Sequence, residues 1–281
     1  MVTSPSDSSA PEQRVGIVVP VFNTGGLASQ AARSAYAALG SRSSIIIVDD
    51  GSTNSATRAA LDELRSEGFT VHRQPNGGVS AARNSGIALL SNPYVIALDS
   101  DDEVMPWAPR SMADVMDADE TVAIVTGAAY EERDGVETLQ PAPEKVVTRE
   151  SMRDYSLLAT ASMFRRSAWE RVRGFPEGLS MGEDWVFWMR ILRLGGVVKS
   201  LDEPTVRRHL GGHQVTSGRI DVRQSTRART LVRSENSDLY SGREASLIEQ
   251  LNAAETHLAA YRHAYRHIDR AKRAFKRWAP R

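Results

Sequence analysis

The stretch YVIALDSDDEV, residues 94–104, joins a short apolar run to a cluster of acidic side chains. The run YVIAL is typical of a buried β-strand, and the acidic residues that follow it are Asp99, Asp101, Asp102 and Glu103. Like charges repel, so such a cluster needs a cation or hydrogen-bond donors to neutralise it. Mg²⁺ and Mn²⁺ prefer oxygen ligands. The stretch therefore predicts a metal site at a strand end, with a solvated turn before a helix near Pro106 as the alternative. A calcium loop is excluded because Val104 occupies the position that requires glycine.

Three further Val- and Ile-rich runs, at 15–22, 43–50 and 69–74, are separated by segments with helical patterns. Strands that alternate with helices predict crossover units and a largely parallel sheet. Asn54 or Ser55 is the expected cap of the second helix. Neither a GxxxxGK[ST] loop nor a GxGxxG turn follows the first strand, which excludes the two familiar phosphate loops. Ligands of such sheets gather at the carboxyl ends of the strands, so Asp49 and Asp50 are expected to face the same crevice as the first cluster.

The second half of the chain has weaker patterns. The tripeptide RDG at 133–135 predicts a hairpin turn, and TRESMRDYSLL at 148–158 predicts a helix. From residue 162 we expect a helix, a Gly- and Pro-rich loop, and a second helix from about Asp184 to Leu194. Residues 243–278 have a helical pattern that fits one long amphipathic helix or two short ones.

Composition narrows the classes of protein. The 281 residues are 41% apolar and 25% charged and include no cysteine, which excludes disulfides and thiolate metal sites. The polar leader at 1–14 is expected to be disordered and is not a signal peptide. No run approaches the roughly 20 apolar residues of a membrane span, so we expect a cytoplasmic protein, soluble or resting on the inner surface of the membrane.

Formal charge is distributed unevenly along the chain. Residues 1–205 carry 19 basic and 28 acidic side chains, whereas residues 206–281 carry 16 and 7. An acidic body argues against a nucleic-acid enzyme, because such an enzyme needs a positive face toward phosphates. The basic segment at 262–281, with interleaved aromatic residues, predicts a helix that lies on an anionic membrane. The alternatives are a helix packed on the domain or paired with another subunit, and the oligomeric state stays open.

Five motifs in order give the chain a recognisable pattern: IVVPVFN (17–23), IIIVDDGSTN (45–54), NGGVSAARNSGI (76–87), ALDSDDEV (97–104) and GEDWVFWMR (182–190). In this order and spacing they resemble glycosyltransferase family 2, with the GT-A fold. The resemblance implies a Rossmann-like, mostly parallel sheet flanked by helices at 15–220. A basic C-terminal helical extension at 221–281 would follow it.

The resemblance also implies roles for individual residues. Asp50 would accept a hydrogen bond from the nucleobase, Arg83 would lie near the donor, and Asp99 near the ribose. The residues implied in donor binding are Pro20, Val21, Phe22, Asn23, Asp50, Arg83, Asp99 and Ser100. Those implied in holding Mn²⁺ or Mg²⁺ are Asp101, Asp99, Asp102 and His209, with His213 competing for the place of His209.

The acidic pair Glu183 and Asp184 matches the family's catalytic position. Asp184 would take the proton from an acceptor hydroxyl, with inversion at the anomeric carbon. The charge of Glu183 and burial against Trp185 and Trp188 would raise its proton affinity, which favours a general base. A carboxylate favoured by the helix dipole explains the same location.

The sequence thus predicts a metal-dependent, inverting transferase that moves a sugar from a nucleotide-diphosphate sugar, UDP-linked, to a glycan, lipid-linked or cell-wall polymer acceptor. One alternative is a nucleotidyltransferase, disfavoured because the loop after the first strand has no Lys or Arg. Another is a catalytically silent carbohydrate-binding scaffold, disfavoured by the intact Asp99, Asp101 and Asp184.

Overall fold

The computed structural model describes residues 11–143, 146–210 and 222–241, and the chain divides into two compact units between Glu235 and Asn236. The second unit contributes the short 3₁₀ helix Ser237–Leu239 to the described part. All other described elements belong to the first unit. Its strands are β1 Val15–Val21, β2 Ile45–Asp49, β3 Thr70–Arg73, β4 Tyr94–Ala97, β5 Asp102–Val104, β6 Val122–Arg133, β7 Val136–Gln140, β8 Val146–Val147, β9 Met163–Arg165 and β10 Val197–His209. Its helices are α1 Pro11–Arg14, α2 Leu27–Leu39, α3 Ser55–Ser66, α4 Val79–Leu89, α5 Ala108–Ala118, α6 Arg166–Val172, α7 Glu183–Arg193 and α8 Val222–Glu235.

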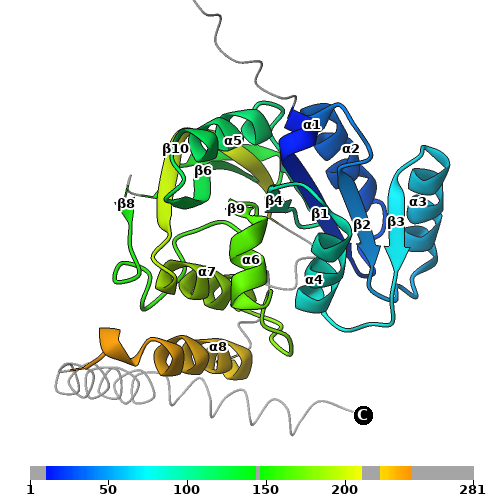
Figure 1. The fold of residues 1–281 in the computed structure, drawn as a ribbon. Coiled ribbons are helices and arrows are strands. Elements are labelled where there is room, and N and C mark those ends of the chain that lie inside the picture. The colour runs from blue at the N-terminus through cyan, green and yellow to red at the C-terminus, as the bar shows by residue number, and fades with distance from the viewer. Residues whose placement is uncertain (1–10, 144–145, 211–221, 242–281) are drawn as a thin grey trace, which may run out of the picture. The chain divides into compact units, whose positions relative to one another are not determined.

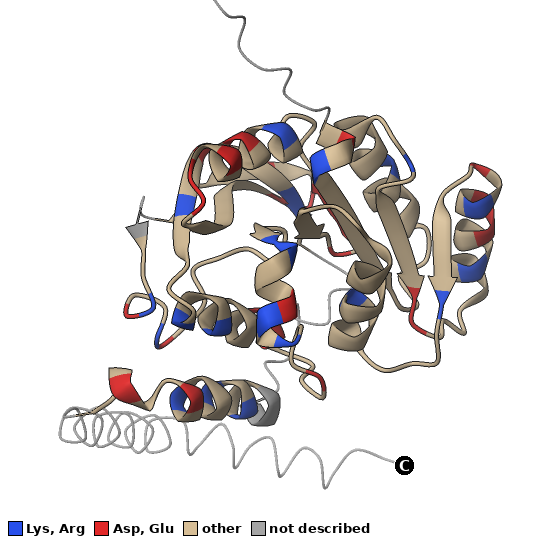
Figure 2. Ribbon diagram, viewed as in Figure 1, with Lys and Arg blue, Asp and Glu red and all other residues tan. Residues whose placement is uncertain are grey.

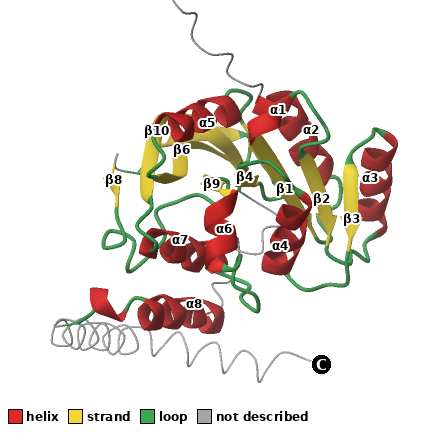
Figure 3. Cartoon of the chain, in the orientation of Figure 1, coloured by secondary structure: helices red, strands yellow, loops and turns green. Residues whose placement is uncertain are grey.

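The strands form one sheet in the order β3-β2-β1-β4-β9-β6-β10-β5, with β7 added to β6 and β8 to β10 (Figure 3). Strand β1 pairs in parallel with β2 and with β4, and β2 pairs in parallel with β3. Strands β6 and β10 also pair in parallel. The short strands β5, β7, β8 and β9 pair antiparallel to their neighbours. This confirms the predicted α/β architecture with a mostly parallel sheet.

Helices cover both faces of the sheet (Figure 1). On one face α2 and α5 pack alanine and methionine side chains against the odd-numbered residues of β1, and α3 adds Leu61 and Leu64 to the same core. On the other face α4 lies against β1 and β2, while α6 and α7 follow β9. Strand β1 is therefore buried along its whole length, which explains its unbroken apolar sequence.

At the carboxyl end of the sheet, strand β1 extends further than its neighbour β4, so the last residues of β1 have no partner in β4. The last pair between them joins Val18 to Ala97. Pro20 lies two residues after Val18. Any other residue at this position would direct its backbone N–H beyond the end of β4, and proline has no such group. A proline in a central strand therefore costs no ladder hydrogen bond here, and the chain after β4 can turn away to form the site.

Two local predictions are confirmed by the hydrogen bonds of the backbone. The side chain of Asn54 caps α3 by accepting from Thr57 N at 3.0 Å. The tripeptide RDG forms the turn between β6 and β7, in which Asp134 and Gly135 have φ angles of 54° and 77°. Such angles suit a tight hairpin whose twist matches that of its strands.

One predicted helix is absent, and another begins later than predicted. Residues 148–158 form turns and bends. Met152 O accepts a hydrogen bond from Trp185 Nε1 at 2.7 Å, which ties this segment to α7. Residues 163–165, expected to begin a helix, form strand β9 between β4 and β6. The helix starts only at Arg166. In both places contacts distant in sequence override the local pattern.

The extension predicted at 221–281 is described only in part. Helix α8 belongs to the first compact unit and contacts α7 through Glu235, whose carboxylate accepts two hydrogen bonds from Arg190. The helical pattern at 243–278 and the basic segment at 262–281 lie outside the described residues, as do residues 1–10 of the predicted leader. Among the helices that are described, none combines the length and the apolar character needed to cross a bilayer.

The packing of α4 on the sheet generates a stability prediction at Gly86. A Cβ atom there would lie 2.2 Å from Val18 Cγ2 and 2.9 Å from Val48 Cγ2, both on buried strands. Alanine is about 1 kcal/mol more favourable than glycine in a helix, but overpacking a rigid core costs about 1–3 kcal/mol. We expect Gly86→Ala to lower the free energy of unfolding in urea. A more stable variant would show that α4 does not pack this closely.

Candidate active site

The carboxyl ends of β1 and β2 are tied together by side chains that bond to backbone. Asn23, with a φ angle of 56°, accepts hydrogen bonds from Thr53 N and Asn54 N through its Oδ1. The ring of Phe22 is 47% exposed beside this junction, whereas Val21 is fully buried. Of the residues implied in donor binding, Phe22 and Asn23 therefore present side chains to solvent, whereas Pro20 and Val21 are buried.

The two aspartates at the end of β2 hold neighbouring loops. Asp49 accepts a hydrogen bond from Ser52 N and pairs with Arg73 at the end of β3. In Figure 2 acidic colour at the end of β2 lies beside basic colour at the end of β3. Asp50, which is 3% exposed, accepts from Gln74 Nε2, Gly77 N and Gly78 N, each at 2.8 Å. The carboxylate of Asp50 thus fixes the loop that leads into α4. The contact of Asp50 with a nucleobase stays a prediction. The carboxylate would have to accept that hydrogen bond in addition to these three.

Three aspartates gather at the turn after β4. Asp102 N donates to Asp99 O and closes this turn, in which Ser100 is buried. Burial and the charge of Asp99 raise the pKa of Asp101. Burial and the charges of Asp99 and Asp101 raise the pKa of Asp102 well above its usual range, and its Oδ1 atom is buried without a hydrogen-bond partner. The charge of Arg208 opposes both rises without outweighing them, so the described residues neutralise Asp101 and Asp102 only in part.

The chemistry of this cluster fits a hard divalent cation. Carboxylate oxygens are the donors that such ions prefer, and a cation would relieve both the repulsion and the unpaired oxygen of Asp102. Across the described ranges, however, no three His, Asp or Glu side chains are already arranged to hold a metal. A bound ion would therefore take one or two carboxylates here and complete its coordination with water and with diphosphate oxygens of a donor.

His209 ends β10 between two glutamates. Its Nδ1 lies 2.6 Å from Glu132 Oε2, and its Nε2 lies 2.7 Å from Glu103 Oε1. Burial alone would lower the pKa of His209, but the hydrogen bonds and charges of Glu132 and Glu103 outweigh burial and raise it. Both ring nitrogens are engaged, so the predicted role as a metal ligand would require His209 to leave one glutamate. His213 lies outside the described residues.

Arg83 of α4 joins the turn after β4 to the start of α7. Its Nη2 donates to Asp99 Oδ1 at 2.7 Å, and its Nη1 donates to Glu183 Oε1 at 2.8 Å. The side chain is 2% exposed. The sequence predicted Arg83 near the donor but gave no sign that it joins these two carboxylates.

Asp184 follows Glu183 on the first turn of α7. Its Oδ1 accepts from Trp185 N at 2.7 Å, and Thr160 Oγ1 lies 3.4 Å from its Oδ2. Burial and the adjacent charge of Glu183 raise the pKa of Asp184 to about 6, against the opposing effect of Arg83. An aspartate with this pKa is mostly ionised at neutral pH yet binds a proton more readily than an ordinary one, which suits a general base.

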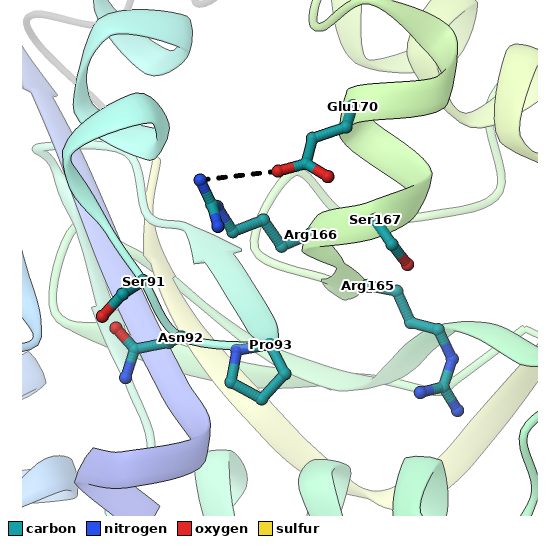
Figure 4. A pocket seen from close by; sticks show the side chains of 7 residues that line it. All are labelled: Ser91, Asn92, Pro93, Arg165, Arg166, Ser167 and Glu170. Carbon is teal, nitrogen blue, oxygen red and sulfur yellow. Dashed lines mark ion pairs between the residues drawn. The ribbon is translucent and has the colours of Figure 1, made fainter.

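The hollow drawn in Figure 4 lies away from these residues. Its volume is about 230 Å³, and it lies at the amino end of β4, where Arg166 faces Glu170 at 3.4 Å. Its lining residues are Ser91, Asn92, Pro93, Arg165, Arg166, Ser167 and Glu170. None of the residues predicted for the site is among them, so the candidate site is the open carboxyl edge of the sheet.

The environment of Asp184 can be measured directly. We expect a ¹³C NMR titration of its carboxyl carbon to give a pKa of about 6. In Glu183→Gln the pKa should fall, because the neighbouring negative charge is removed. Glu63→Gln on α3 is the matched control and should leave the titration unchanged. A pKa near the ordinary value of about 3.9 in the unmodified protein would contradict this account of the site.

Solved structures share this architecture. The structure of S. aureus TarS 1–349 in complex with UDP-GlcNAc matches with a TM-score of 0.62 at 20% identity, over 74% of this chain and 61% of that one. The UDP complex of the same protein matches with a TM-score of 0.63 at 18% identity, over 79% of this chain and 65% of that one. At this level of identity the likeness establishes the fold, and it confirms the GT-A fold.

Sequence comparisons identify the family. A chondroitin synthase of Escherichia coli is 24% identical over 217 residues, which are 75% of this chain and 31% of that protein. Glycosyltransferase GlyG of Streptococcus pneumoniae is 28% identical over 124 residues, 43% of this chain and 41% of that protein. The chain thus spans less than half the length of either relative. The profile of Glycosyl transferase family 2 matches residues 16–172, more than half of the chain, and the chain belongs to this family.

Proposed function

We propose that this chain transfers a sugar from a UDP-linked nucleotide-diphosphate donor to a hydroxyl group of a glycan, lipid-linked or cell-wall polymer acceptor. The observation that carries the proposal is the pair of acidic clusters that Arg83 joins. The turn after β4 supplies carboxylates whose charge the described residues neutralise only in part, and α7 supplies Asp184 with a pKa of about 6. One cluster suits the diphosphate side of the reaction, and the other suits the proton that the acceptor must lose.

In the proposed reaction the acceptor oxygen forms a bond to the anomeric carbon while the bond from that carbon to the diphosphate oxygen breaks. Asp184 takes the acceptor proton, and the electron pair of the broken bond leaves with the diphosphate. Attack from the face opposite the leaving group inverts the configuration. Glu183 is less suited to be the base, because Arg83 already holds its carboxylate and it is 8% exposed.

Mn²⁺ or Mg²⁺, when bound, would stabilise the negative charge that builds on the departing diphosphate. Asp101 and Asp99 would hold the ion. Asp102 could replace one of them, because its Oδ1 has no hydrogen-bond partner and is free to coordinate. On the donor side Phe22 offers an exposed ring against which a base can stack, next to the loop that Asp50 fixes. The preference for UDP is supported by the neighbouring fold, because TarS was solved with UDP-GlcNAc and with UDP.

Contact of the basic segment 262–281 with an anionic membrane, and with it a location at the inner membrane surface, stays part of the proposal. That segment lies outside the described residues. A lipid-linked acceptor lies at the membrane, so such contact would bring the site close to the acceptor. Self-association of the chain stays open.

Substitution of the proposed base tests the function. Asp184→Asn keeps the shape of the side chain but cannot accept the proton, so transfer should fall by about 10²–10⁴-fold, the usual contribution of a general base. The binding of UDP should change by less than about threefold, because Asp184 lies on the acceptor side. UDP release from a panel of UDP-sugars with glycan acceptors gives the rate, and calorimetry gives the affinity.

The matched control is Asp62→Asn on the exposed face of α3, which should behave like the unmodified protein. Transfer by Asp184→Asn at a near-normal rate would remove Asp184 from the role of base. Failure of the unmodified protein to release UDP from any donor would instead favour a silent scaffold of the same fold.

A further inference from the structure

Arg83 is a buried cation held by two carboxylates from distant parts of the chain. Asp99 is 16 residues away along the sequence and Glu183 is 100 residues away. The side chain of Asp99 is 30% exposed and that of Glu183 is 11% exposed, so water screens the pair only weakly. Removing the cation would leave these two negative charges without a partner, which is costly in a buried setting.

The residue that follows Arg83 holds the same region in place. Asn84 Oδ1 accepts from Phe175 N at 2.8 Å and from Trp169 Nε1 at 3.0 Å, and Asn84 Nδ2 donates to Phe175 O. The guanidinium of Arg83 lies 5.2 Å from the ring of Phe175, which itself stacks on Phe187 of α7. Two consecutive residues of α4 therefore fix the segment that precedes α7 and the first turn of α7 itself.

The geometry of the side chain explains why an arginine occupies this position. A guanidinium presents several N–H donors in a fixed plane, so it can bond two carboxylates at once. A lysine would carry the same charge on a single nitrogen and could not keep both bonds at these distances and directions. Because Arg83 is 2% exposed, a donor phosphate could reach its guanidinium only after one of the carboxylates had moved away.

We propose that Arg83 is a positioning residue that couples the donor side of the site to the acceptor side, by holding Asp99 and Glu183 at fixed places and so setting the position of Asp184. The inference rests on the proposed sugar transfer and deepens it. It differs from the donor contact that the family resemblance implies for Arg83. A donor contact would act on nucleotide affinity, whereas a positioning link acts on turnover once the donor is bound.

The conservative variant Arg83→Lys separates these two roles. It keeps the charge and should fold, but it loses one of the two bonds. We expect kcat for UDP release to fall at least tenfold while the Kd of UDP changes less than threefold. A matched control is Arg14→Lys, because Arg14 is also buried and bonds two carboxylates, Asp114 and Asp117, away from the site.

Arg14→Lys should shift the midpoint of urea unfolding less than Arg83→Lys does, because the side chains of Asp114 and Asp117 are 55% and 46% exposed, and it should leave kcat unchanged. A kcat that falls equally in both variants would reduce the effect of Arg83 to general stability and overturn the proposal. An Arg83→Lys variant with normal kcat and a weakened affinity for UDP would also overturn it, in favour of direct donor contact.

A double-mutant cycle with Glu183→Gln tests the link itself. If Arg83 acts through Glu183, the double variant should lose little more than the worse single variant, both in kcat and in the urea midpoint. Fully additive losses would overturn the proposal. The unfolding half of the cycle needs no donor or acceptor. It therefore decides whether the link exists even if the unmodified protein releases no UDP, an outcome that would count against the proposed function alone.

Discussion

The ion pairs of Arg83 are the constraint on which the candidate site depends. Three elements meet there: helix α4 supplies the guanidinium, the turn after β4 supplies Asp99, and α7 supplies Glu183. Buried charges are stable only when they are paired with good geometry, so none of the three elements can move independently without exposing an unpaired charge. The fold thus brings its two acidic motifs to one place by means of a basic residue from a third motif.

The same arrangement makes the site unevenly charged. Arg83 pairs with Asp99 and Glu183, but Asp101 and Asp102 have no comparable partner among the described residues, and their pKa values are raised. On the acceptor side burial and the charge of the adjacent Glu183 raise the pKa of Asp184. Binding of a positive charge is therefore favoured in both halves of the site: a metal cation at Asp101 and Asp102, and a proton at Asp184. This is the electrostatic demand of a reaction in which a diphosphate leaves and a hydroxyl group is deprotonated.

Much of the sheet could be predicted from the sequence because three of its first four strands, β1, β2 and β4, are continuous apolar runs bounded by polar residues. The acidic residues that follow β2 and β4 led to the prediction of a site at the carboxyl edge of the sheet. The prediction of a helix at 148–158 was wrong because Trp185 Nε1 donates a hydrogen bond to Met152 O. A contact between residues so far apart cannot be predicted from the local sequence. Strand β9 was missed for a similar reason, since Met163 is paired in register with Ile96 and Val125. The engagement of His209 by Glu103 and Glu132 depends on strand register, which no local pattern reveals.

In the proposed reaction the aspartates after β4 hold a divalent cation for a nucleotide diphosphate. Calorimetric titration of the full chain with UDP, GDP and dTDP, each in Mn²⁺ and in EDTA, measures this dependence. UDP should bind in Mn²⁺, its binding should be lost in EDTA, and it should be weakened in Asp101→Ala. Equal binding in Mn²⁺ and in EDTA, or no binding of any of the three nucleotides, would show that these aspartates do not hold a metal ion for a nucleotide.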